Sequence, residues 1–144
     1  VWLLTTQSYA DEQVSEEMTE YRRVDGSDTA ATILKKYLER QPDAMRYTIH
    51  SGATFSVKEW DYSQLWQRAE EIFRTSGYKN EVMIADITGG TKMMSIALAM
   101  ACLPPKRRMQ YMDAARDWQG NPQPQGKLSP VMIDIDPIVE DLTD

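Results

Sequence analysis

One segment restricts the possible folds of this chain more than any other: a strand-like run, a glycine turn and an apolar helix in direct succession. The run EVMIADI (81–87) is apolar enough for a central strand of a parallel sheet. Gly89 and Gly90 follow it, and TKMMSIALAMAC (91–102) then has the composition of a helix that ends before Pro104. A strand that leads through a tight turn into a helix is the repeating unit of parallel α/β sheets.

The segments on either side repeat this alternation. Apolar runs predict strands at 1–7, 45–52, 107–113 and 131–136, and apolar periodicity predicts helices at 27–40 and 61–77. No helix separates the last two strands, so the final strand should pair antiparallel. The polar, acidic segment 8–26 is expected to be a long loop with a helical turn or two. The fold class is therefore α/β: one domain over 1–144, with a Rossmann-like, mostly parallel sheet flanked by helices and an antiparallel edge strand.

Charge and composition exclude several classes of function. The net charge is -6, whereas proteins that bind duplex nucleic acid are usually basic. One cysteine and one histidine cannot build a zinc site or an intrachain disulfide, and they fit a reduced, intracellular setting. No apolar run approaches the ~20 residues that span a bilayer. A small anionic ligand stays possible, because backbone dipoles and one lysine can hold it in an acidic protein.

The glycine turn has the composition of such an anion site. Ligands of open parallel sheets bind beyond the carboxyl ends of the strands, where residues 88–92 should lie. Gly89 and Gly90 allow a close backbone approach, while Thr88, Thr91 and Lys92 add hydroxyl groups and a positive charge. The spacing matches neither the Walker A loop nor G-x-G-x-x-G. A Gly-Gly turn can also be purely structural, and the flanking threonines and lysine favour the phosphate site.

The motif DITGGTKMMSIALA (86–99) resembles the signature of CARF domains, the CRISPR-associated Rossmann folds that sense cyclic oligoadenylates in type III antiviral immunity. The resemblance covers residues 1–115, and it is weaker over 8–26 and in the final strand. It implies a homodimer that reads one ring-shaped second messenger with both subunits, without a metal or other cofactor. It places ligand-binding residues in two segments: Thr6, Gln7 and Ser8, and Thr88, Gly89, Gly90, Thr91, Lys92 and Met93. Ser51 and Gly52 are further candidates, since they end the predicted strand 45–52 at its carboxyl end.

The resemblance implies a sensor module rather than an enzyme. The expected ligand is cyclic tetra-adenylate, whose two-fold symmetry matches a dimer, and ligand binding would change an effector outside this chain. No catalytic residue is assigned. The alternative is a metal-independent ring nuclease that cleaves the same ligand with the same donors. A third interpretation is a nucleotide-responsive regulator unrelated to CRISPR. Some small family members carry a membrane helix before the domain, so the expected setting is a cytoplasmic domain tethered to the inner membrane by a segment absent from this chain.

The predicted helix 91–102 supplies an independent argument for a dimer. It is apolar on nearly all sides, so Ile96, Leu98 and Met100 cannot all face one sheet. Its small residues would let a second backbone approach closely: Ser95, Ala97, Ala99 and Ala101. The alternative is that other parts of the same chain cover the helix.

The basic segment 104–108 (PPKRR) resembles a phosphate patch, but the preceding helix runs away from the ligand edge of the sheet. Lys106, Arg107 and Arg108 are therefore predicted to complement the carboxyl end of that helix.

Overall fold

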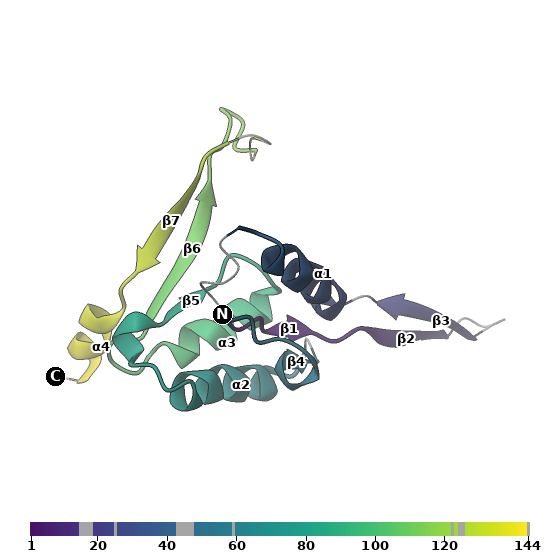
Figure 1. Cartoon of the computed structure of the whole chain (residues 1–144), viewed down its shortest axis with the longest axis horizontal. Coiled ribbons are helices and arrows are strands. Elements are labelled where there is room, and N and C mark those ends of the chain that lie inside the picture. Colours follow the sequence, from purple (N-terminus) through teal and green to yellow (C-terminus); the bar gives the residue numbers. More distant parts are fainter. Residues whose placement is uncertain are drawn as a thin grey trace. The chain divides into compact units, whose positions relative to one another are not determined.

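The computed structural model describes residues 1–14, 19–24, 26–42, 48–58, 60–121, 123 and 126–143 (Figure 1). The chain divides into two compact units, Val1–Arg68 and Ala69–Asp144, which are described in turn. Helix α2 (Tyr62–Thr75) contributes its first half to one unit and its second half to the other. In the described part of the chain, none of the helices combines the length and the apolar character that crossing a membrane requires.

The first unit contains a short parallel sheet. Strand β1 (Thr5–Thr6) pairs with β4 (Ser56–Val57), and helix α1 (Ser27–Glu39) lies between them in sequence. A 3-10 turn, η2 (Ala53–Phe55), precedes β4. The predicted strand 45–52 falls partly outside the described residues. Its described part forms a single parallel bridge, between His50 and Trp2, whose rings stack with centroids 4.9 Å apart.

The prediction that segment 8–26 is a long loop with a helical turn or two was wrong. Strands β2 (Tyr9–Val14) and β3 (Thr19–Val24) form an antiparallel hairpin, and residues 15–18 between them lie outside the described part. The polar composition concealed the strands, because a hairpin pairs its backbone groups whatever its side chains are. The register runs from Tyr9 opposite Val24 to Val14 opposite Thr19.

Helix α1 begins and ends close to the predicted bounds, but its apolar face is not covered. Ala31 is the buried residue of this helix. Ile33, Leu34 and Tyr37 recur at the helical spacing that predicted this helix, and their side chains are exposed. The pattern therefore predicted the helix correctly without indicating which side is packed.

The second unit contains a three-stranded sheet in the order β5-β6-β7. Strand β5 (Ile84–Asp86) pairs parallel with β6 (Arg108–Ala114), and β7 (Leu128–Ile133) pairs antiparallel with β6. The connection between β5 and β6 is helix α3 (Lys92–Ala101), so β5, α3 and β6 form the predicted strand–helix–strand unit. The α/β class, its Rossmann-like parallel pairing and its antiparallel edge strand are confirmed.

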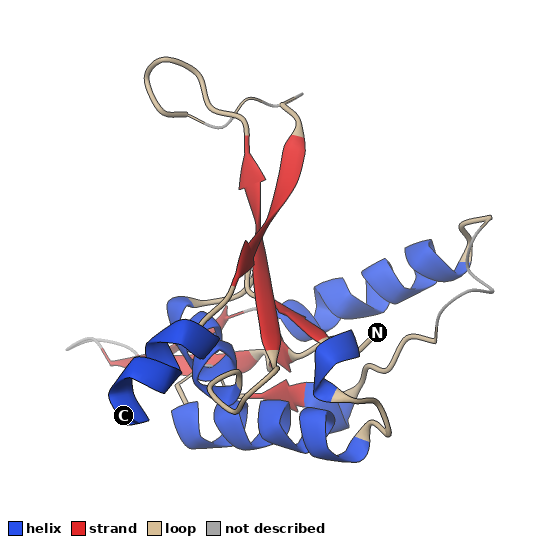
Figure 2. Cartoon of the chain, turned by 90° about the vertical axis from the view of Figure 1, so that its left-hand side faces the viewer, coloured by secondary structure: helices blue, strands red, loops and turns tan. Residues whose placement is uncertain are grey.

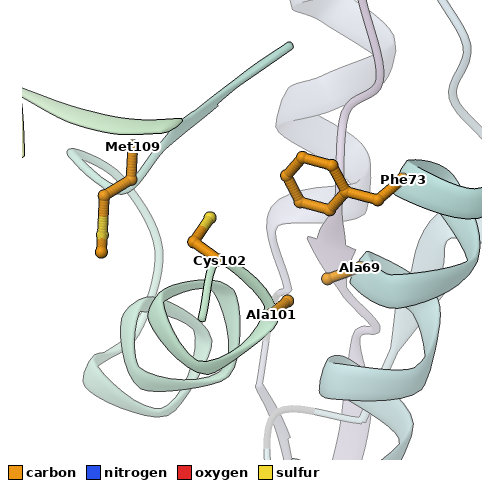
Figure 3. Packing of buried hydrophobic residues seen from close by; sticks show 5 residues of the cluster. All are labelled: Ala69, Phe73, Ala101, Cys102 and Met109. Carbon is orange, nitrogen blue, oxygen red and sulfur yellow. The ribbon is translucent and has the colours of Figure 1, made fainter. Parts of the chain in front are cut away.

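The core of this unit lies between the second half of α2, the end of α3 and the start of β6. Ala69 and Phe73 of α2 face Ala101 and Cys102 at the end of α3, and Met109 of β6 completes the cluster (Figure 3). A short 3-10 turn, η3 (Asn80–Val82), leads from α2 into β5. Burial of these apolar side chains fixes α3 against the sheet and thereby positions the turn from which α3 starts.

Helix α3 exposes a different face from the predicted one. Ile96 is 52% exposed and Met100 is 44% exposed, which agrees with the expectation that not all apolar residues of this helix face the sheet. Ala97 and Ala101, however, are fully buried, so these two small residues cannot form an outer contact face. An almost uniformly apolar helix carries no periodicity that would distinguish its inner from its outer side.

Helix α4 (Asp136–Thr143) was not predicted, because residues 131–136 were assigned to the last strand. That strand ends at Ile133. The carboxylate of Asp134 then accepts a hydrogen bond of 3.1 Å from the backbone N–H of Asp136, which turns the chain into the helix. Asp136 and Pro137 at the helix start are signals that could have been recognised in the sequence.

Candidate functional site

The glycine turn lies at the carboxyl end of β5, as predicted, and two hydrogen bonds with the neighbouring strand β6 hold its start. The backbone N–H of Ile87 donates to the carbonyl of Gln110 at 2.9 Å, which extends the pairing with β6. The hydroxyl oxygen of Thr88 accepts a bond of 2.7 Å from the backbone N–H of Met112. The turn therefore starts from a fixed point on the sheet.

Asp86 is the second anchor of the turn. Its carboxylate accepts hydrogen bonds of 2.9 Å from the backbone N–H of Thr88 and from the side-chain amide of Gln110. Burial alone would raise the pKa of Asp86, but the hydrogen bonds from Thr88 and Gln110 outweigh it and hold this pKa below its ordinary value. Asp86 is therefore an ionised carboxylate with a positioning role. The part of Gln110 was not predicted, and nothing in the sequence signals it.

Gly90 is required by the backbone of the turn. Its φ is +87°, a conformation that disfavours side chains, and a Cβ there would lie 2.9 Å from the sulfur of Met94. Gly89 differs, because an added Cβ would meet no atom within 4 Å. The open space at Gly89 leaves room for a ligand beside the backbone.

Helix α3 starts directly after these glycines. The side chain of Thr91 caps it by accepting a bond of 3.3 Å from the N–H of Met94, and the carbonyl of Thr91 accepts from Ser95. The backbone N–H groups of residues 89–93 have no acceptor among the described residues. The ammonium group of Lys92 is exposed and likewise forms no ion pair or hydrogen bond within the described part of the chain.

These groups form a row of donors at a positive helix end. Five successive amides, one exposed ammonium group and the helix dipole all favour an anion. Met93 follows with a side chain that is partly exposed. The arrangement can hold a phosphate group without a metal ion.

The other predicted segment, Thr6 to Ser8, lies at the end of β1 in the first unit, and its polar groups bind the start of α1. The backbone N–H of Thr6 donates to Ser27 Oγ at 2.9 Å, and the N–H of Ser27 donates back to Thr6 Oγ1 at 3.1 Å. The hydroxyl of Ser8 donates to Asp28 at 3.1 Å and accepts from the N–H of Gly26 at 3.0 Å. Thr6 is buried.

Gln7 also binds within the first unit: its side-chain amide donates to the backbone carbonyl of Ser56 in β4 at 2.9 Å. Burial would raise the pKa of Asp28, but hydrogen bonds from Thr29 and Ser8 hold it below its ordinary value. The third group, Ser51 and Gly52, precedes η2, and Gly52 has a φ of +114° with no atom near its would-be Cβ. The structure thus brings Thr6, Gln7 and Ser8 together at the end of β1, and Thr88 to Met93 together in the second unit.

All three cations of the basic segment 104–108 were predicted to complement the carboxyl end of α3, and only Arg107 does so; Lys106 and Arg108 contact Glu81 instead. The guanidinium of Arg107 donates to the carbonyl of Ala101 at 2.6 Å, at the end of α3. It also pairs with both carboxylate oxygens of Glu70 and lies 4.5 Å from the ring centroid of Phe73. Lys106 and Arg108 bind the side chain and the backbone carbonyl of Glu81, respectively. The buried Arg107 therefore has a structural role, whereas Lys106 and Arg108 are exposed.

Among the described residues, no group of three or more histidine, cysteine, aspartate or glutamate side chains could hold a metal ion. No protein-family model matches the chain, and a search of curated proteins finds no match.

Proposed function

We propose that the chain is a sensor domain for a cyclic oligoadenylate, the second messenger of type III CRISPR antiviral defence. One observation carries this proposal: five consecutive backbone N–H groups and the ammonium of Lys92 lack partners among the described residues, at the start of α3. The resemblance of residues 86–99 to the CARF signature supports the identity of the anion. Each copy of the chain would hold a phosphate of the ring on this row of donors.

The ring is expected to be cyclic tetra-adenylate, held across a homodimer. A four-membered ring has two-fold symmetry, and a pair of identical chains presents its donor rows with the same symmetry. The exposed apolar side chains of α3, Ile96 and Met100 among them, support a second copy as the partner, since they lie on the helix that begins at the donor row.

The sensor would pass ligand binding on to an effector outside this chain through β6. The glycine turn is joined to β6 by the bonds from Met112 to Thr88 and from Gln110 to Asp86. A ligand that draws the turn toward its phosphate therefore also acts on the strand. Binding can shift this element only by as much as its affinities for the two positions of the turn differ.

Calorimetry with three ligands tests the proposal. Cyclic tetra-adenylate should bind with one ring per two chains, and linear tetra-adenylate and adenosine monophosphate should bind at least tenfold more weakly. Equal binding of the mononucleotide would overturn the ring assignment and favour a general nucleotide-responsive regulator. The same samples are then separated by chromatography: an intact ring supports a sensor, and linear products would identify a ring nuclease.

A further inference from the structure

The hairpin formed by β6 and β7 ends in a tryptophan that the second unit leaves uncovered. Figures 1 and 2 show this hairpin extending away from the helices of its unit. Trp118 lies in the connection between the two strands, and its side chain is 91% exposed. Single exposed apolar residues are ordinary in soluble proteins, so exposure alone decides nothing.

The turn that carries Trp118 is held in one conformation by its own hydrogen bonds. The carboxylate of Asp117 accepts bonds of 2.9 Å from the backbone N–H groups of Gln119 and Asn121. The N–H of Asp117 donates to the carbonyl of Asn121, and the guanidinium of Arg116 donates to the carbonyl of Gly120 at 2.8 Å. A tryptophan presented from a fixed turn loses little conformational entropy when it binds, which is the property of an interface anchor.

The hairpin adds apolar surface behind this anchor. The register pairs Ala114 with Leu128, Met112 with Pro130 and Gln110 with Met132, so these residues share one face. Leu128 and Met132 are among the exposed apolar residues of the chain. Trp118 therefore lies at the end of a hairpin arm, formed by β6 and β7, that exposes further apolar side chains.

The same unit exposes a second apolar surface, on α3. Four exposed side chains form this stripe, which is called the α3 stripe: Met93, Ile96 and Met100 of the helix, and Leu103 directly after its end. Two of them are methionines, whose flexible side chains adapt to an aromatic ring and whose sulfur atoms make favourable contacts with it. The exposure of Trp118 means that its own copy does not bring it onto the stripe.

We infer that Trp118 of one copy docks on the α3 stripe of a second copy. This inference rests on the homodimer of the proposed function and specifies what the second chain places on α3. Two surfaces of one chain that do not meet within it are both covered in a two-fold pair, because the contact then forms twice. Two such contacts, each an indole on a stripe with the adjoining arm residues, would bury on the order of 1,000 Å², which is the lower limit of a specific interface.

Disulfide trapping tests this contact. One chain carries Gln119→Cys, which keeps Trp118, and a second chain with a different tag carries Met100→Cys. The native Cys102 does not interfere, because it is buried and burial raises its pKa to about 11, against the opposing influence of Arg107. Under mild oxidation the two chains should join in a mixed dimer. The matched control replaces Met100→Cys by Lys79→Cys, an exposed position outside the stripe.

Three results would overturn the inference. The first is a mixed dimer that is no more abundant than with Lys79→Cys. The second is a disulfide between two Met100→Cys chains, which would indicate helix-on-helix packing. The third is a disulfide within one chain when both cysteines are placed in that chain. Sedimentation supplies the second readout: Trp118→Ala should weaken dimerisation at least tenfold with an unchanged Tm, whereas Trp60→Ala should not. If trapping succeeds and the ring does not bind, the contact stands and the proposed ligand is wrong.

Discussion

The hydroxyl oxygen of Thr88 accepts a 2.7 Å hydrogen bond from the backbone N–H of Met112, and this bond joins the glycine turn to β6. It lies beyond the last paired residues of β5 and β6, Asp86 and Gln110, so it continues the connection between the two strands by a side chain. The bond therefore connects the glycine turn directly to β6, the first strand of the β6–β7 hairpin.

Replacing Thr88 by valine removes this acceptor and keeps the shape of the side chain. The N–H of Met112 is near solvent, so water replaces the lost partner and the expected loss in the free energy of unfolding is only about 0.5–1 kcal/mol. Ring affinity should fall more, because the turn loses its anchor. Thr88→Ser keeps the acceptor and is the control. Calorimetry and urea unfolding of both variants measure the two effects; a valine variant with wild-type affinity would contradict the role of the anchor.

Lys92→Ala should weaken ring binding without affecting folding. The ammonium group has no partner among the described residues, so the loss falls on the ligand alone, at roughly 1.5–3 kcal/mol for one charge-assisted contact. Lys79→Ala, another exposed lysine of the same unit, controls for the change in net charge. Isothermal calorimetry and melting curves are compared for the three proteins. Equal affinity in Lys92→Ala would remove this lysine from the site.

Gly90→Ala should destabilise the turn, whereas Gly89→Ala should not. The added Cβ at Gly90 meets the sulfur of Met94 at 2.9 Å and sits on a backbone with φ of +87°, which costs roughly 1–2 kcal/mol. At Gly89 the Cβ meets no atom within 4 Å, so any loss of affinity there reports on the ligand. Chemical denaturation of both variants checks the ranking, and equal stability would show that the turn relaxes around a side chain.

The parts of this fold that were predictable are those whose signal is local. The order of strand, turn and helix in the run 81–102 could be predicted, because apolar length, glycine and proline act within a few residues. The strand itself is shorter than predicted, Ile84–Asp86 after a 3-10 turn, and it lies at the edge of its three-stranded sheet and not at the centre. The roles of Thr6 and Ser8 were not predictable, since their partners Ser27 and Asp28 lie about twenty residues away and meet them only in the folded chain. The hairpin formed by β2 and β3 was not predicted, because its mostly polar sequence lacks the apolar pattern by which strands are recognised.

The pH dependence of stability should report on the pair of Glu70 and Arg107. The hydrogen bonds from Arg107 lower the pKa of Glu70 below its ordinary value of 4.5, although burial opposes this. A depressed folded-state pKa means that the stabilisation is present above the unfolded-state pKa and is lost as the pH falls through the folded-state pKa. The free energy of unfolding of the wild type, measured with urea, should therefore decrease as the pH falls below about 4.5.

Glu70→Gln should abolish the part of this pH dependence that Glu70 supplies, and it should lower stability at pH 7 by up to about 3 kcal/mol, since it leaves the buried Arg107 without its counter-charge. The double variant Glu70→Leu with Arg107→Met removes both charges, so its stability shows how much of the loss in Glu70→Gln comes from leaving Arg107 unpaired. A Glu70→Gln protein with the pH profile of wild type would show that other carboxylates account for the acid sensitivity.

Two neighbouring substitutions on α3 should have opposite effects, because Ile96 is 52% exposed and Ala97 is fully buried. Ala97→Glu forces a charge into the interior, and the chain should unfold at a markedly lower temperature. Ile96→Glu leaves the fold and its Tm intact and instead places a charge on the surface that a second copy would cover. The Ile96 variant should therefore sediment as a monomer and lose ring affinity at least tenfold, since each copy supplies only half of the phosphate contacts.

Ile33→Glu, on the exposed face of α1, is the matched control for an apolar-to-acidic change and should leave the dimer and ring binding unaffected. A dimer that persists in the Ile96 variant with full ring affinity would show that α3 does not form the interface.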